Sequence, residues 1–294
     1  MWRKRGVGDL VFDACNTIFL LGLVAVTVYP LLYVAFASLS NPTAVAQHRG
    51  VLLRPLGLTL DAYRLVFTNP MITIGYRNTL LYVVAGTTIN LIMTCLGAYA
   101  LSRKNVLLGT PIMFMIVFTM FFSGGLVPDY LLVANTLDWI NTPWAVIIPP
   151  AISTLNLIIM RTAFSAVPEA LIEAARIDGA NDLTILARVV LPLAMPVVAV
   201  MLLFYGVAHW NSWFPAMIYL RSRDLYPLQL VLREILIISN VDQMTTGIAS
   251  GDVMPIGETI KYATVIVATV PILCVYPFLQ RYFVRGVMIG AIRE

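Results

Sequence analysis

Residues 173 to 192 read EAARIDGANDLTILARVVLP, a polar stretch between two long apolar runs. Seven of its twenty residues are charged or are Gly or Pro. Just before it, Pro168 suits the first helical position, and Glu169 lies where the helix dipole favours an acid. Gly179 suits the left-handed position that follows a helix, and Asn181 or Asp182 can cap the next one. The sequence therefore predicts a helix of about three turns within residues 168–182.

The composition decides the class of protein in which this polar stretch lies. Of the 294 residues, 60% are hydrophobic and only 12% are charged, and the mean hydropathy is +0.86. Soluble domains carry about 25% charged residues. The chain is therefore expected to be an integral membrane protein. Its net charge of +4 is attributed to Lys and Arg that gather on the cytoplasmic side of a membrane protein, and a nucleic-acid partner is excluded.

Six apolar runs without Asp, Glu, Lys or Arg are long enough to be membrane spans. Because the backbone must satisfy its own hydrogen bonds in hydrocarbon and no alternating strand pattern is present, the spans are expected to be helices. The first run has 22 residues, longer than the apolar region of a signal peptide. The expected fold is an all-α polytopic protein of one domain over residues 1–294, with spans at 17–38, 78–101, 106–123, 143–160, 189–214 and 262–280.

Orientation follows from the positive residues in short loops. The loop SRKN, residues 102–105, has two, whereas residues 124–142 have none. Both termini are therefore expected in the cytoplasm, with the 168–182 helix on the same side. An outer loop over 216–261 contains LYPLQLVLREIL, residues 225–236, which has helical apolar spacing. That helix either lies on the outer leaflet or docks an external protein.

The 168–182 helix is itself open to two interpretations. At 100° per residue, Glu169, Glu173 and Arg176 share one side. Leu171, Ala174 and Ala175 share the other. The helix could be a plain interfacial connector, but such an anchor needs bulky apolar residues and basic flanks. Alanines and acids instead make a small, negatively charged protrusion, which is expected to fit a groove in another protein.

The stretch EAARIDGA, followed by Leu191 and Pro192, resembles the cytoplasmic signature of permease subunits of binding-protein-dependent ABC importers. FTMFFSGGLVPDYLLV at 118–133, NTPWAVIIPPAIS at 141–153 and the tail QRYFVRGVMIGAIRE at 280–294 are similar to the carbohydrate-uptake branch. Within that branch, the chain most resembles permeases for complex oligosaccharides such as aldouronate and alginate fragments. In this family the helix at 168–182 is a coupling helix that sits in a cleft of the ATPase subunit.

The resemblance implies the site and the partners. The ATPase-coupling residues would be Glu169, Glu173, Ala174, Ala175, Arg176, Asp178, Gly179 and Ala180. The partners would be a homologous second permease, two ATPases, an extracytoplasmic solute-binding protein and an oligosaccharide, at a bacterial inner membrane. Since the chain lacks the G-x-x-x-x-G-K-[ST] phosphate loop, ATP and Mg are expected on the ATPases, and no catalytic residue, metal site or cofactor is predicted here. In related permeases the tail reaches the ATPase.

The translocation pathway is predicted from FYGVAHWNSWF, residues 204–214. Flat aromatic faces beside amide donors suit a sugar, which selects the candidates Tyr205, His209, Trp210 and Asn211. The alternative for the tryptophans is an interfacial aromatic belt. Two rival functions remain: an ion-coupled secondary transporter, which would usually carry ionisable groups inside its spans, and an ATP-independent scaffold subunit.

Overall fold

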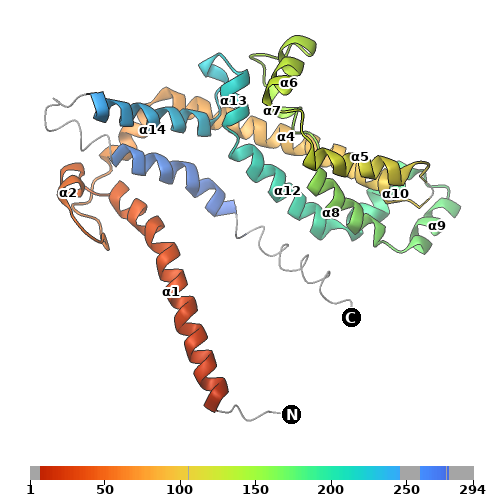
Figure 1. The fold of residues 1–294 in the computed structure, drawn as a ribbon, viewed down its shortest axis with the longest axis horizontal. Helices are drawn as coiled ribbons and strands as arrows, with labels where there is room; N and C mark the ends of the chain where they lie inside the picture. The colour runs from red at the N-terminus through yellow and green to blue at the C-terminus, as the bar shows by residue number, and fades with distance from the viewer. Residues whose placement is uncertain (1–6, 105, 246–258, 276, 278–294) are drawn as a thin grey trace. The chain divides into compact units, whose positions relative to one another are not determined.

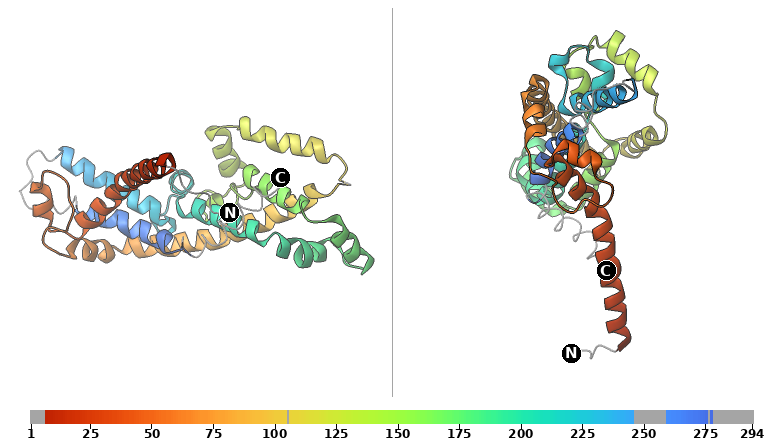
Figure 2. Two further views of the ribbon diagram at one scale, coloured as in Figure 1. Left: turned by 90° about the horizontal axis from the view of Figure 1, so that it is seen from below. Right: turned by 90° about the vertical axis from the view of Figure 1, so that its left-hand side faces the viewer.

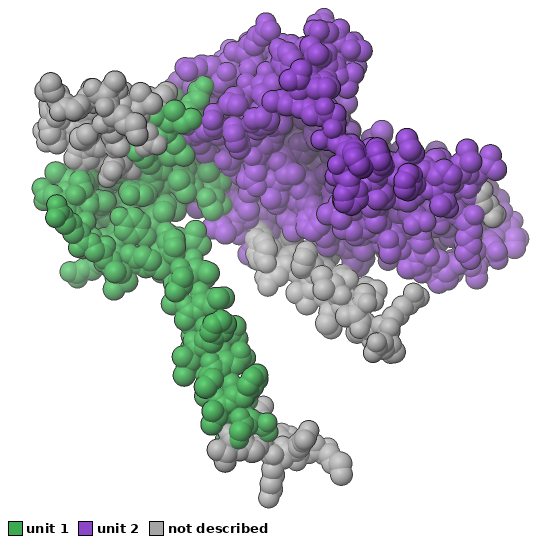
Figure 3. All heavy atoms as spheres, in the orientation of Figure 1, with its two compact units in different colours: residues 1–69, 234–269 green, residues 70–233, 270–294 purple. Residues whose placement is uncertain are grey.

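The computed structural model describes residues 7–104, 106–245, 259–275 and 277. Its contacts divide the chain into two compact units, residues 1–69 with 234–269 and residues 70–233 with 270–294 (Figure 3). Throughout the described residues the regular elements are helices (Figure 1). The all-α expectation is thus met.

The first unit contains α1 (Val7–Ser38), α2 (Pro42–Gln47) and α3 (Asp61–Thr68). Most side chains of α1 are exposed, and they are apolar, as expected of a helix whose solvent is lipid. Only its C-terminal end is fixed by packing, where Ala37 joins a small core with Val45 and Leu52. The Leu52 N–H donates to the Tyr29 hydroxyl at 3.2 Å, which ties the following loop to α1.

The second unit is built around α4 (Pro70–Ser102), which packs along α8 (Thr154–Ser165) and α12 (Met195–Trp210) (Figures 1 and 2). The remaining elements are α5 (Gly109–Phe121), α6 (Leu126–Leu131), the π-helix η1 (Leu132–Thr136), α7 (Trp144–Ile147), α9 (Glu169–Ile177), α10 (Asp182–Ile185), the π-helix η2 (Leu186–Val190), α11 (Leu191–Leu193), α13 (Phe214–Tyr219) and the 3₁₀ helix η3 (Arg223–Leu225). Two helices continue from one unit into the other, α14 (Leu228–Thr245) and the helix Thr259–Val275.

Buried polar side chains along α4 explain how so apolar a unit fixes its packing. The Asn78 amide donates to the carbonyls of Asp224 and Tyr226, and the Thr79 hydroxyl accepts the Leu228 N–H at 2.8 Å. Farther along, the Asn90 amide donates to the Pro150 carbonyl at 2.7 Å. Each bond satisfies a backbone group at a place where another helix is interrupted.

Two of the expected helices are broken in the structure, and the run 106–123 is helical only over Gly109–Phe121. The run 143–160 is not continuous: α7 ends at Ile147 and α8 begins at Thr154, because Pro149 and Pro150 lack the N–H that a continuous helix needs. The run 189–214 is bent by 89° between Asp182–Leu193 and Met195–Trp210. Its break lies at Ala194, between Pro192 and Pro196, and α12 ends at Trp210.

Two described helices, Gly8–Ser38 and Pro70–Ser102, are long and apolar enough to cross a membrane. The number rises to five if each of three bent helix pairs is one span. Thr259–Val275, which overlaps the sixth expected run, is apolar but shorter. The count of six spans therefore stays a prediction. Residues 278–280 of the sixth run and the tail 280–294 lie outside the described residues.

Candidate functional site

The candidate coupling helix is α9, whose two ends are set by the residues that flank it. Pro168 is its N-cap rather than its first helical residue, with an extended ψ of 128°. At the other end Gly179 has a φ of +83°, in the left-handed region that favours glycine. The Gly179 N–H donates to the Arg176 carbonyl, and the Ala180 N–H to the Ala175 carbonyl, both at 3.0 Å. These two bonds form a Schellman motif, which ends the helix after nine residues.

One residue of α9 anchors it to the second unit. Ile172 is fully buried in the core that α4, α8 and α12 share. Glu169 and Ala175 flank it and are half-buried, while Leu171 and Ala174 are exposed. The helix therefore rests on a bulky apolar side chain, and the side on which Leu171 and Ala174 lie faces outward.

The outward surface of α9 is more apolar than the sequence suggested. It carries the exposed Glu173, Ala174 and Asp178 that were expected, but also Leu171 and Ile177, with exposed fractions of 45% and 86%. Leu171 and Ile177 therefore add two large apolar side chains to this surface. Among the predicted coupling residues, Gly179 is also exposed and Ala180 is half-buried.

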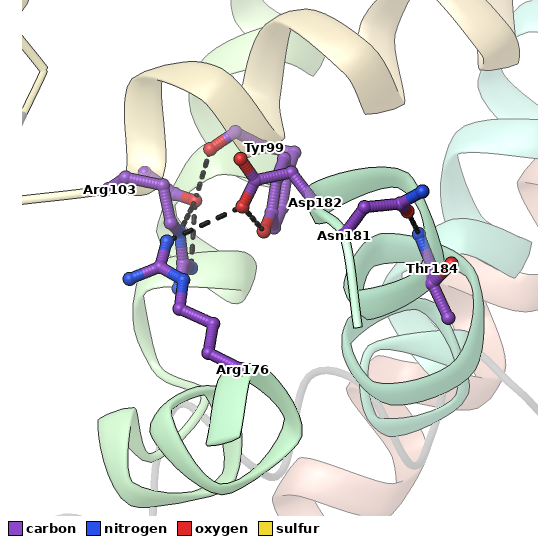
Figure 4. A network of polar contacts seen from close by, with 7 residues as sticks. Tyr99, Arg103, Arg176, Asn181, Asp182 and Thr184 are labelled. Atoms are coloured by element: carbon purple, nitrogen blue, oxygen red, sulfur yellow. Dashed lines mark hydrogen bonds and ion pairs between the residues drawn. The ribbon is translucent and has the colours of Figure 1, made fainter. Parts of the chain in front are cut away.

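A polar network joins α9 to α10 and α4 (Figure 4). Arg176 of α9 forms an ion pair with Asp182 at 3.4 Å, and the same carboxylate oxygen accepts the Tyr99 hydroxyl of α4 at 3.1 Å. Asn181 caps α10, because its side chain accepts the Thr184 N–H at 2.8 Å. Arg176 is thus engaged within the chain, whereas Glu173 has no hydrogen bond or ion pair to any residue that the structure describes.

Short breaks separate α9 from the long helices next to it. α8 and α9 are bent by 73° relative to one another. After Asn181, the helical stretch Asp182–Leu193 leads to the bend before α12 and includes η2. The Ile172 anchor and the Asp182 carboxylate therefore join α9 to α4 and α12.

The predicted pathway residues are mostly buried within the second unit. The Tyr205 hydroxyl bonds to the Thr94 hydroxyl at 2.7 Å and accepts the Ser153 N–H at 3.1 Å. His209 Nε2 bonds to the Asn90 side-chain oxygen at 3.0 Å, and its ring lies against Gly86, where a Cβ would collide with it.

Trp210 is 7% exposed, and Asn211 is exposed. Trp210 lines an apolar cavity of about 430 Å³ together with Tyr76, Leu80 and Pro271. The polar groups of Tyr205 and His209 thus serve as cross-links between helices, while Asn211 is the candidate whose side chain is open to a ligand.

Sequence reasoning missed two residues beside α9. Arg103 donates through Nη2 to the Phe164 carbonyl at 3.0 Å, and Arg161 donates through Nε to the Leu101 carbonyl at 2.9 Å. From the sequence, Arg103 was used only as a positive charge of the loop SRKN, and Arg161 was not singled out. The available signal was their position near the ends of apolar runs, where cations can bond the last helical carbonyls.

The short helix α9 lies within the stretch where the sequence predicts the coupling helix of an importer permease. Comparison with known proteins agrees: residues 104–289 match the family model described as a binding-protein-dependent transport system inner membrane component. The chain belongs to this family and has the type I ABC permease fold.

Relatives and a solved structure match over nearly the whole chain. Protein LplC of Bacillus subtilis (strain 168) is 39% identical, covering 96% of this chain and 95% of that protein. The polygalacturonan/rhamnogalacturonan transport system permease protein YtcP of the same organism is 38% identical, covering 96% and 98%. A chain of the crystal structure of a bacterial ABC transporter involved in the import of the acidic polysaccharide alginate matches with a TM-score of 0.85 and 32% identity, covering 96% of this chain and all of that one.

Proposed function

We propose that this chain is the permease subunit of an ATP-driven importer that brings acidic oligosaccharides into a bacterial cell. The observation that carries the proposal is α9, anchored by Ile172, ended at Gly179 and left with an outward surface of Leu171, Glu173 and Ile177. This surface would be the part that docks to an ATPase. The family membership supports it, because a binding-protein-dependent system needs an external receptor and an energy source.

The proposed assembly is the one expected from the sequence. This chain pairs with a homologous permease, two ATPases bind ATP and Mg, and a solute-binding protein delivers the sugar from outside. The chain itself is non-catalytic and forms a single permease domain in the inner membrane, with both termini and α9 in the cytoplasm. ATP-driven closure of the ATPases would move α9, and with it α4 and α12.

Acidic oligosaccharides are proposed because of two similarities. One relative belongs to a polygalacturonan/rhamnogalacturonan transport system, and the similar solved structure belongs to an importer of the acidic polysaccharide alginate. Galacturonan is a polymer of a uronic acid, so the two share a carboxylated sugar. Asn211 and the ring edge of Trp210 are the proposed pathway contacts, while Tyr205 and His209 position the helices around them.

The decisive experiment is uptake into proteoliposomes that contain the full transporter, with ATP inside and the solute-binding protein outside. Labelled uronic-acid trisaccharide is the test substrate, and a neutral maltodextrin of the same length is the matched control. We expect uptake of the acidic sugar only when both the ATPases and ATP are present. Uptake without the ATPases would support an ion-coupled transporter instead, and ATP hydrolysis without any uptake would support a scaffold.

A further inference from the structure

A polar cavity of about 570 Å³ lies where the C-terminal ends of α4 and α8 approach the start of α5. Three basic residues line it, Arg103, Lys104 and Arg161, with Glu169 as the acidic residue of the lining. Because the long apolar helix α4 ends here, we expect the cavity to lie near the depth where the hydrocarbon of a membrane gives way to headgroups. It is separate from the outward surface of α9.

The hydrogen-bond donors of these basic residues are only partly used. Arg103 bonds to Ser102 and Phe164, but its Nη1 is buried and has no hydrogen-bond partner. Arg161 donates through Nε, and Lys104 is exposed. Within the residues that the structure describes, none of the three cations forms an ion pair. Because Arg103 Nη1 is closed off from solvent, the Lys104 ammonium is the donor that an acceptor from outside the chain can reach, and the guanidinium groups of Arg103 and Arg161 add positive charge to the lining.

The surface next to the cavity is apolar and exposed. The cavity is lined by Gly109, Thr110 and Pro111 at the start of α5, and no residue of α5 is buried. Farther along the same helix, Phe114 and Met115 are 67% and 63% exposed. A soluble anion would use only the basic cavity, whereas a lipid would use both the cavity and the apolar helix.

We propose that this cavity binds a phosphate group, and that its source is the headgroup of an anionic phospholipid whose acyl chains lie along α5. Basic pockets between helix ends are a recurring mode of anionic-lipid binding. The Lys104 ammonium donates to the phosphate, while the bonds of Arg103 to Phe164 and of Arg161 to Leu101 hold two further positive charges at the cavity wall. Since Glu169 of α9 also lines the cavity, a bound lipid would lie beside the coupling helix.

Native mass spectrometry of the purified full transporter tests the proposal. The probes are phosphatidylglycerol and, with the same acyl chains, zwitterionic phosphatidylcholine. We expect phosphatidylglycerol to be retained in preference to phosphatidylcholine. Its binding should be about fivefold weaker in Lys104→Gln and about 25-fold weaker in Lys104→Glu, because these variants lower the charge by one and two. Arg188→Gln is the matched control, because it removes one exposed charge outside the cavity and should leave retention unchanged.

Two further arms separate the sources of phosphate. Inorganic phosphate at millimolar concentration should fail to displace phosphatidylglycerol; displacement would overturn the lipid and assign a soluble anion. Equal retention of the two lipids, or equal binding by the wild type and Lys104→Glu, would overturn the site. Lys104 is exposed, so both of its variants are expected to fold as the wild type does.

Discussion

Arg103 and Arg161 cross-link α4 and α8 in opposite directions. Arg103 follows α4 and donates to the Phe164 carbonyl near the end of α8, while Arg161 lies in α8 and donates to the Leu101 carbonyl near the end of α4. Each guanidinium thus bonds to a carbonyl in the last turn of the other helix, where intrahelical donors run out. The two bonds fix the helix ends from which the chain turns into α5 and α9.

Removing either arginine should destabilise this end of the second unit. For Arg161→Gln or Arg103→Gln, we expect the free energy of unfolding to fall by about 1.5 to 3 kcal/mol, since a charge-assisted hydrogen bond to a helix end is lost. Thermal unfolding of the detergent-purified transporter measures it, with Arg188→Gln as the control. Because the bonds join the same two helices, the double variant should lose less than the sum, and strict additivity would contradict a shared cross-link.

Glu173 should matter for coupling but not for folding. Its side chain is exposed and has no partner among the described residues, so Glu173→Lys is expected to leave the free energy of unfolding within about 0.5 kcal/mol of the wild-type value. If a basic groove of the ATPase receives it, charge reversal should lower ATP-dependent uptake at least about tenfold, and Glu173→Gln less. Uptake assays in proteoliposomes measure both variants. Wild-type uptake by Glu173→Lys would show that this carboxylate does not dock.

Gly179 should be replaceable only by a residue that can adopt its left-handed backbone conformation. A Cβ here would meet open space, so the cost comes from the φ of +83° alone. Gly179→Ala should cost about 1 to 2 kcal/mol, and Gly179→Asn less, because asparagine enters the left-handed region more readily. Gly179→Pro should abolish coupling, since it also removes the N–H that donates to Arg176. Equal uptake by the alanine, asparagine and proline variants would contradict the assigned geometry.

Ile172 and Ile177 form a matched pair on one helix. Ile172 is fully buried, so Ile172→Ala should cost about 2 to 5 kcal/mol and loosen α9 from the second unit. Ile177 is 86% exposed, so Ile177→Ala should barely change the free energy of unfolding and should instead weaken binding of the ATPase. Thermal unfolding and co-purification with the ATPase separate the two effects. Loss of stability in Ile177→Ala would contradict its place on the outward surface.

The C-terminal end of α9 was predictable because the interactions that set it are local. The carbonyls that Gly179 and Ala180 reach lie within five residues, and Asn181 caps a helix through a residue three positions later. The family could likewise be identified from EAARIDGA and its flanking stretches, and the matched model agrees. The outward side of α9 was predicted less well, because the choice of Ile172 as the anchor depends on the core beneath it.

The sequence by itself determined that this is a helical membrane protein, because composition and long uncharged runs decide which solvent a chain can tolerate. It also determined where α9 ends. Only the tertiary structure decided that Asn90 would bond to Pro150 and His209. The same holds for Arg103 and Arg161, each of which bonds to a carbonyl near the end of the other's helix. Those partners lie some 60 or more residues away along the chain, and a periodic pattern carries no information about which distant carbonyl a side chain will meet.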